Sequence, residues 1–185
     1  AYESMVRAVT VLYAREHYSP AVAEEAATEE LRRGFLWTKE LTDVFERFRK
    51  THPGELFAGA MPDVVKFFKA LAPTMPERIQ MLPKIVRVSI KADSEVEAGE
   101  GVLEVVFDRN MDTSRKGVSG IPVASWPDGS KGAKWAEDGL SVRIPYKLEA
   151  GQEYTLTIGN VYYPSYQSAD GWPLDPVGIY FKTKP

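Results

Sequence analysis

The sequence predicts an α+β protein of two modules, an all-helical segment followed by an antiparallel β-sandwich of about seven strands. Up to residue 72 the apolar residues recur with the period of a helix, and after residue 83 they alternate with the period of a strand. The stretch between them, PTMPERIQMLP, contains three prolines. We therefore expect a helical domain over 1–72, itself the C-terminal part of a larger domain, a linker over 73–83 and a sandwich over 84–185.

Four helices are expected in the first module. The first carries one apolar stripe at helical spacing, and Ser19-Pro20 is typical of an N-cap followed by proline at the first helical position of the second. Gly34 ends the second helix, and Thr38 is a plausible N-cap for the third, which His52-Pro53-Gly54 ends. Pro62 begins the fourth helix.

Short runs rich in β-branched and aromatic residues fill the second module, separated by Gly, Asp, Asn and Pro. With no helical pattern between them, they predict an antiparallel sandwich. The runs are PKIVRVSIKA, VLEVVFD, GIPVAS, LSVRIP, EYTLTIG and VGIYFKT.

Composition excludes several classes of function. The 185 residues carry a formal net charge of -3 with the basic residues scattered, which argues against a nucleic-acid partner. No apolar run approaches the roughly 20 residues that span a bilayer, so we expect no transmembrane segment. The absence of cysteine removes thiol nucleophiles, disulfides and thiolate metal sites.

The second module resembles the bacterial Ig-like domains of S-layer and other envelope proteins. In LEAGQEYTLTIG, Leu148 and Gly151 precede Tyr154, the pattern of a tyrosine corner, in which the hydroxyl bonds backbone a few residues upstream. FDRNMD, WAEDGL, ADGWPL and FKT follow the order of motifs in that family. The resemblance implies a non-catalytic spacer or binding module on an exported bacterial protein, and therefore an extracytoplasmic location: periplasm, cell surface or outside the cell.

Glu3 and Arg7 stand four residues apart on the first helix. One interpretation is an exposed ion pair worth roughly 0.2–0.5 kcal/mol. The other comes from a resemblance: the stretch from Glu3 through RGFLWTKEL is similar to the region downstream of His-Glu-x-x-His in bacterial zincin-like metallopeptidases. There a glutamate completes the zinc site, so the resemblance implies that Glu3 is the third ligand and that the other ligands belong to polypeptide preceding this chain.

We expect no complete metal site within the chain. Glu3 and His17 are separated by ~21 Å along a helix at 1.5 Å per residue, and His52 follows a helix, where the dipole favours a cation. Asp108, Asp112, Asp128, Asp138 and Asp170 are spread over different hairpins and are interpreted as turn formers rather than as calcium ligands. Zinc is thus possible only in the full-length protein.

One loop of the second module is rich in aromatic residues: Tyr162, Tyr163, Tyr166 and Trp172. Two further aromatic residues, Trp126 and Trp135, lie elsewhere in the module and could extend the same surface. They could bind glycan or protein, because Tyr and Trp are frequent in binding surfaces, or they could cover the sandwich core or dock on the helical half.

The first hypothesis for the whole chain is the C-terminal fragment of an exported bacterial metallopeptidase-like protein, not catalytic by itself. The alternative is a non-enzymatic envelope or adhesion protein whose Ig-like module binds glycan or protein. A complete small helical–β scaffold is the third.

Overall fold

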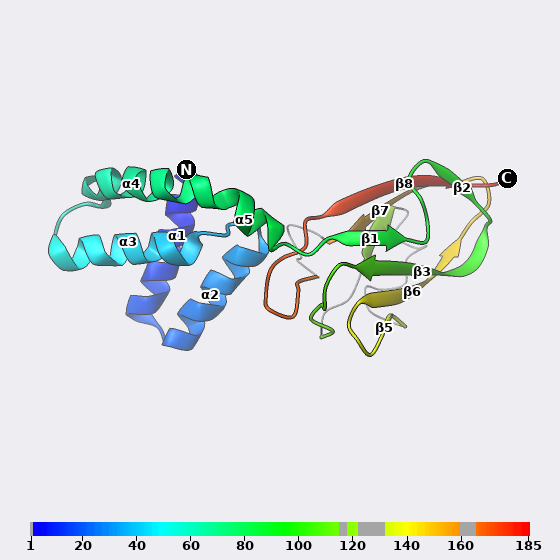
Figure 1. Ribbon diagram of the computed structural model, residues 1–185, viewed down its shortest axis with the longest axis horizontal. Coiled ribbons are helices and arrows are strands. Elements are labelled where there is room, and N and C mark those ends of the chain that lie inside the picture. The colour runs from blue at the N-terminus through cyan, green and yellow to red at the C-terminus, as the bar shows by residue number, and fades with distance from the viewer. Residues whose placement is uncertain (1, 115–117, 122–131, 160–165) are drawn as a thin grey trace. The chain divides into compact units, whose positions relative to one another are not determined.

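The fold comes from a computed structural model that describes residues 2–114, 118–121, 132–159 and 166–185 (Figure 1). The chain divides into two compact units, Ala1–Met81 and Leu82–Pro185. The boundary falls within the stretch interpreted as a linker. Most of that stretch is nevertheless helical, and it belongs to the first unit.

The helical unit contains the four expected helices. In Figure 1, α1 and α2 run beside each other, and α3, which contacts α1, runs across it at a steep angle. A further short helix lies in the proline-rich stretch. The helices are α1 (Tyr2–His17), α2 (Pro20–Arg32), α3 (Thr38–Thr51), η1 (Phe57–Ala60), α4 (Met61–Leu71), η2 (Ala72–Thr74) and α5 (Met75–Gln80).

The predicted start of α2 is confirmed, and the predicted start of α3 is shifted by one position. The Ser19 hydroxyl accepts a hydrogen bond from the amide of Val22 at 3.3 Å. Thr38 is the first helical residue of α3, not its N-cap, and Trp37 holds the cap position without a side-chain bond. Thr38 is buried, and its hydroxyl instead donates to the Phe35 carbonyl at 3.0 Å.

The core of the helical unit forms where α1 meets α3, η1 and α4. The buried cluster combines small side chains with large aliphatic and aromatic ones. The buried members are Ala8, Leu12, Leu41, Phe45, Phe48, Ala60 and Val64.

The second unit is a sandwich of two four-stranded sheets, in the orders β1-β3-β6-β5 and β2-β8-β7-β4. Among the strands that the structure describes, every pairing is antiparallel except that of β2 with β8, which is parallel. The strands are β1 (Ile85–Val88), β2 (Ser94–Val96), β3 (Gly99–Phe107), β4 (Val118–Ile121), β5 (Lys134–Trp135), β6 (Ser141–Leu148), β7 (Glu153–Ile158) and β8 (Val177–Thr183).

The expected alternation of strand residues sets the sandwich core. Leu103 pairs with Ile144 and Val105 with Val142 in one sheet, and all four side chains are buried. In the other sheet, the buried residues Leu156 and Ile158 alternate with more exposed neighbours along β7. This pattern is typical of strands with one face on the core.

The tyrosine corner predicted from LEAGQEY is confirmed. The Tyr154 ring is 1% exposed and stacks on Phe181 with ring centroids 5.3 Å apart. Its hydroxyl accepts a hydrogen bond from the amide of Glu149 at 2.8 Å, five residues upstream. The corner thus fixes the end of β6 to the start of β7.

Candidate functional site

Glu3 lies in the first turn of α1, and its side chain is 67% exposed. Arg7, one turn further on, donates to the same Glu3 oxygen, Oε1, from Nη2 at 2.7 Å and from Nε at 3.3 Å. Among the described residues, no hydrogen bond to Oε2 is observed. The ion pair expected from the i, i+4 spacing is therefore present, and it engages one oxygen of the carboxylate.

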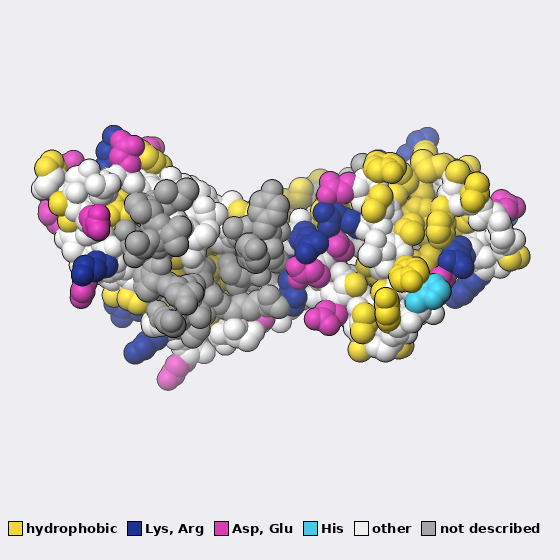
Figure 2. All heavy atoms as spheres, turned by 180° about the vertical axis from the view of Figure 1, so that it is seen from behind, with side chains coloured by type: hydrophobic (Ala, Val, Ile, Leu, Met, Phe, Trp, Pro, Cys, Tyr) yellow, Lys and Arg dark blue, Asp and Glu magenta, His cyan; other side chains and the backbone are white. Residues whose placement is uncertain are grey.

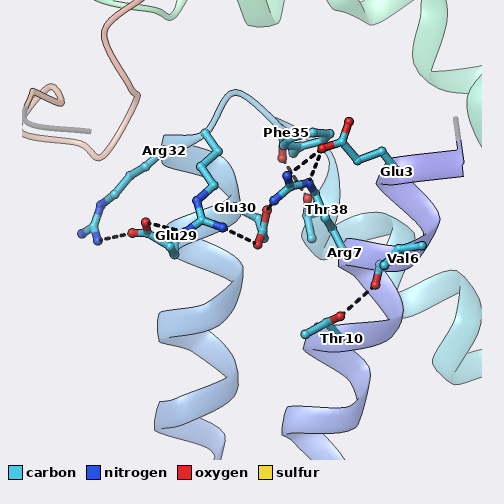
Figure 3. A network of polar contacts seen from close by, with 10 residues as sticks. Glu3, Val6, Arg7, Thr10, Glu29, Glu30, Arg32, Phe35 and Thr38 are labelled. Atoms are coloured by element: carbon cyan, nitrogen blue, oxygen red, sulfur yellow. Dashed lines mark hydrogen bonds and ion pairs between the residues drawn. The ribbon is translucent and has the colours of Figure 1, made fainter. Parts of the chain in front are cut away.

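Arg7 is itself anchored by residues outside α1 (Figure 3). Its Nη1 donates to Oε2 of Glu30 on α2, and its guanidinium lies over the ring of Phe35 at 4.1 Å from the centroid. The Arg7 and Glu30 side chains are 22% and 14% exposed. Partial burial disfavours the charged guanidinium and by itself lowers the pKa of Arg7. The hydrogen bonds to Glu3 and Glu30 outweigh burial, so the pKa of Arg7 lies above its usual value. Arg7 is a charged, well-anchored partner for Glu3.

Glu3 is the residue of this chain that the sequence indicates as a possible zinc ligand. No three His, Asp or Glu side chains within these ranges come together in a way that could hold a metal ion. His17 ends α1 with its ring 4.2 Å from that of Tyr13, and His52 stacks on Phe48 at 4.7 Å after α3. A carboxylate such as Glu3, with one oxygen oriented by a hydrogen bond, fits the role of a single ligand.

An apolar groove of about 350 Å³ opens beside this network, and we call it the α1 groove. Val6 lines the α1 groove and is 49% exposed. It follows Glu3 by three residues, so the two side chains lie on neighbouring parts of the helix surface. On the face seen in Figure 2, the helical unit carries a broad band of apolar side chains. The α1 groove is lined by Met5, Val6, Val9, Thr10, Phe45, Phe57, Ala58 and Met61.

The aromatic residues proposed for ligand binding have different surroundings. Tyr166 is 2% exposed and packs against Phe107 and Trp135, with ring centroids 5.6 and 5.9 Å away, so it belongs to the core and presents no face to an external ligand. Trp172 is half-buried in a turn held by Ser168, whose hydroxyl accepts from the Trp172 amide at 3.0 Å. Tyr163 lies outside the described residues.

Tyr162, Trp126 and Asp128 also lie outside the described residues. Two of the other predicted turn acids, Asp138 and Asp112, make the contacts expected of turn formers. Asp138 Oδ1 accepts from the Leu140 amide at 2.9 Å, and Asp112 Oδ1 accepts from the Ser114 amide at 3.0 Å. Such bonds from a carboxylate to the backbone two residues on are Asx turns.

Asp108 joins two segments of the sandwich. Its Oδ1 accepts from the Lys84 amide at 2.8 Å, and both of its oxygens receive bonds from Arg109. The pKa of Asp108 is lowered, and the hydrogen bond from Arg109 is the largest cause. Burial raises this pKa, whereas the hydrogen bond from the Lys84 amide lowers it further.

Comparisons with known proteins found a limited likeness to solved structures. No family model and no curated protein matches the chain. Among solved structures, CopC from Methylosinus trichosporium OB3b is 16% identical, with a TM-score of 0.44, and the match covers 56% of this chain and 94% of that one. A titin M10–obscurin-like 1 Ig complex is 12% identical, with a TM-score of 0.27, over 55% of this chain and 91% of that one.

Neither likeness carries information about function. Sheet order, pairing and the tyrosine corner define the class of protein: an α+β chain with a helical unit followed by an Ig-like β-sandwich. Among the described residues, every helix is too short or too polar to cross a bilayer.

Proposed function

We propose that this chain is the helical and accessory part of an extracytoplasmic bacterial metallopeptidase-like protein and is not catalytic by itself. Glu3 is the third zinc ligand, and two histidines of a His-Glu-x-x-His helix elsewhere in the same polypeptide complete the site. The single observation that carries the proposal is the Glu3 carboxylate, exposed on the first turn of α1 and oriented through one oxygen by an anchored arginine.

The surface beside Glu3 supports this proposal. A segment that brought further ligands to Glu3 would have to pack along α1, where the half-exposed Val6 and the α1 groove present apolar area. Covering such area stabilises an interface by roughly 25 cal/mol per Å². The preceding part of the same polypeptide is thus the partner of the helical unit, while the Ig-like unit acts as a spacer or binding module.

A zinc bound in this way would act as a Lewis acid and would lower the pKa of a bound water. The residues of this chain hold and orient one ligand. Glu3 supplies a carboxylate oxygen, and Arg7 and Glu30 fix its position.

Two measurements on the full-length polypeptide test the proposal. Its sequence is expected to contain His-Glu-x-x-His a few dozen residues before Ala1, and the purified protein is expected to contain about one zinc per chain by elemental analysis. Absence of the motif, or a metal-free protein that takes up no zinc, would remove the peptidase proposal.

A second candidate function rests on Trp172. The aromatic side chain is half-buried in a turn fixed by Ser168, and a pre-organised aromatic surface favours binding of a glycan or an envelope protein. In this reading the chain is part of a non-enzymatic envelope or adhesion protein.

We expect Trp172→Ala to reduce binding on a glycan array, or to envelope extracts, by tenfold or more if Trp172 is a binding residue. Trp135→Phe serves as the comparison, because Trp135 packs against Phe107 and Tyr166 in the sandwich. No signal from either the unaltered or the altered protein would retire this candidate.

A further inference from the structure

We propose that the end of β8 is a latch: Thr183 and Lys184 hold the loop between β6 and β7 (residues 149–152) and the edge strand β2, so that the three segments open and close as one unit. The latch belongs to the sandwich and is independent of the proposed zinc site. A polar residue at a core position points to it. Along β8, Ile179 and Phe181 are buried on the inward face, and the next inward position is that of Thr183, which is 3% exposed.

The buried hydroxyl of Thr183 needs partners, and it finds them in the β6–β7 loop. β6 belongs to one sheet and β7 to the other, so this loop crosses between the sheets and is not bonded as in a hairpin. The hydroxyl donates to the Glu149 carbonyl at 2.6 Å and accepts from the Gln152 amide at 2.9 Å. Both ends of the loop are therefore bonded to one side chain of β8.

Lys184 binds the same loop and also β2. Its carbonyl accepts from the Gly151 amide at 2.9 Å, and its own amide donates to the Val96 carbonyl at 3.0 Å. Its ammonium pairs with Glu97, the residue after β2. The loop and β2 thus share one anchor at the end of β8.

The edge strand β2 depends on this anchor. It has three residues, lies at the edge of its sheet and pairs with β8 in parallel, an arrangement slightly less stable per residue than antiparallel pairing. If β2 left the sheet, the edge of β8 would present unpaired N–H and C=O groups, to which a strand of another chain could add. The latch therefore keeps this edge of the sandwich closed.

Residue-resolved amide hydrogen exchange of Thr183→Val tests the latch, because valine keeps the branched shape and removes the hydroxyl. The Gln152 amide loses its acceptor in this variant, so it exchanges faster with or without a latch. Gly151 and Lys184 keep their own acceptors and are therefore the informative amides. We expect both to exchange faster by the same factor, about tenfold, because bonds lost at a buried residue favour the open state of the whole unit.

Two further variants are the controls. Thr183→Ser keeps a hydroxyl and is expected to retain most of the protection, whereas a loss equal to that of Thr183→Val would remove the hydroxyl from this role. Thr155→Val makes the same substitution at an exposed position of β7. We expect it to change the exchange rates of Gly151 and Lys184 by less than about threefold.

Two patterns of exchange in Thr183→Val would overturn the inference. Unchanged rates at Gly151 and Lys184 would mean that Thr183 bonds the loop locally and latches nothing. The Phe107 amide, which bonds to the Leu140 carbonyl at 2.9 Å beside the other sheet, reports on the rest of the sandwich. An equal rise in its rate would mean that the whole sandwich opens instead of one unit.

Discussion

Replacing Tyr154 with alanine is expected to lower the free energy of unfolding of the sandwich by about 3–5 kcal/mol, the range for deleting a large buried aromatic side chain. The ring is 1% exposed and stacked on Phe181, so its removal leaves a cavity between the two sheets. Tyr154→Phe keeps the ring and removes the hydrogen bond to the Glu149 amide, which is expected to cost about 1 kcal/mol.

Urea unfolding followed by tryptophan fluorescence measures both changes. Tyr180→Phe is the matched control. Tyr180 lies on β8, which pairs with β7, the strand that carries Tyr154, and Tyr180 is 38% exposed. We expect it to change stability by less than about 0.5 kcal/mol. A Tyr154→Ala protein as stable as the Tyr180→Phe protein would contradict the role assigned to the corner.

Zinc binding by the full-length polypeptide is expected to weaken by more than about 100-fold in Glu3→Gln. Outer groups that only orient a ligand already contribute 10–100-fold, and loss of one of three protein ligands should exceed that range. The fold should survive, since the exposed Glu3–Arg7 pair is worth only roughly 0.2–0.5 kcal/mol.

Glu25→Gln is the control for this experiment. Glu25 is an exposed carboxylate on α2, so its substitution makes the same change in net charge on the same unit. A chelator competition assay that returns the same zinc affinity for Glu3→Gln, Glu25→Gln and the unaltered protein would remove Glu3 from the ligand set.

Much of the fold could be predicted because it follows from local patterns. The change of apolar period located the two modules, Ser19-Pro20 located the start of α2, and the spacing of Leu148, Gly151 and Tyr154 located the corner. The three-residue β2 and the two-residue β5 were not predicted, because such short segments show no alternation, and both depend on pairing with longer strands.

The candidate site could be predicted only in part. The i, i+4 spacing identified Glu3 and Arg7, but Glu30 is 23 residues from Arg7, and only the packing of α1 on α2 brings the two together. For Tyr166 the sequence left ligand binding and a place over the core as alternatives, and only its contacts with Phe107 and Trp135 put it in the core. Neither long-range arrangement leaves a periodic signal in the sequence.

Anomalous diffraction at the zinc edge, on crystals of the zinc-loaded full-length polypeptide, tests the central claim most directly. We predict a zinc peak about 2.0–2.2 Å from one oxygen of Glu3, with the other oxygen still bonded to Arg7. A zinc peak coordinated entirely by other residues, with Glu3 bonded to Arg7 alone, would contradict the account.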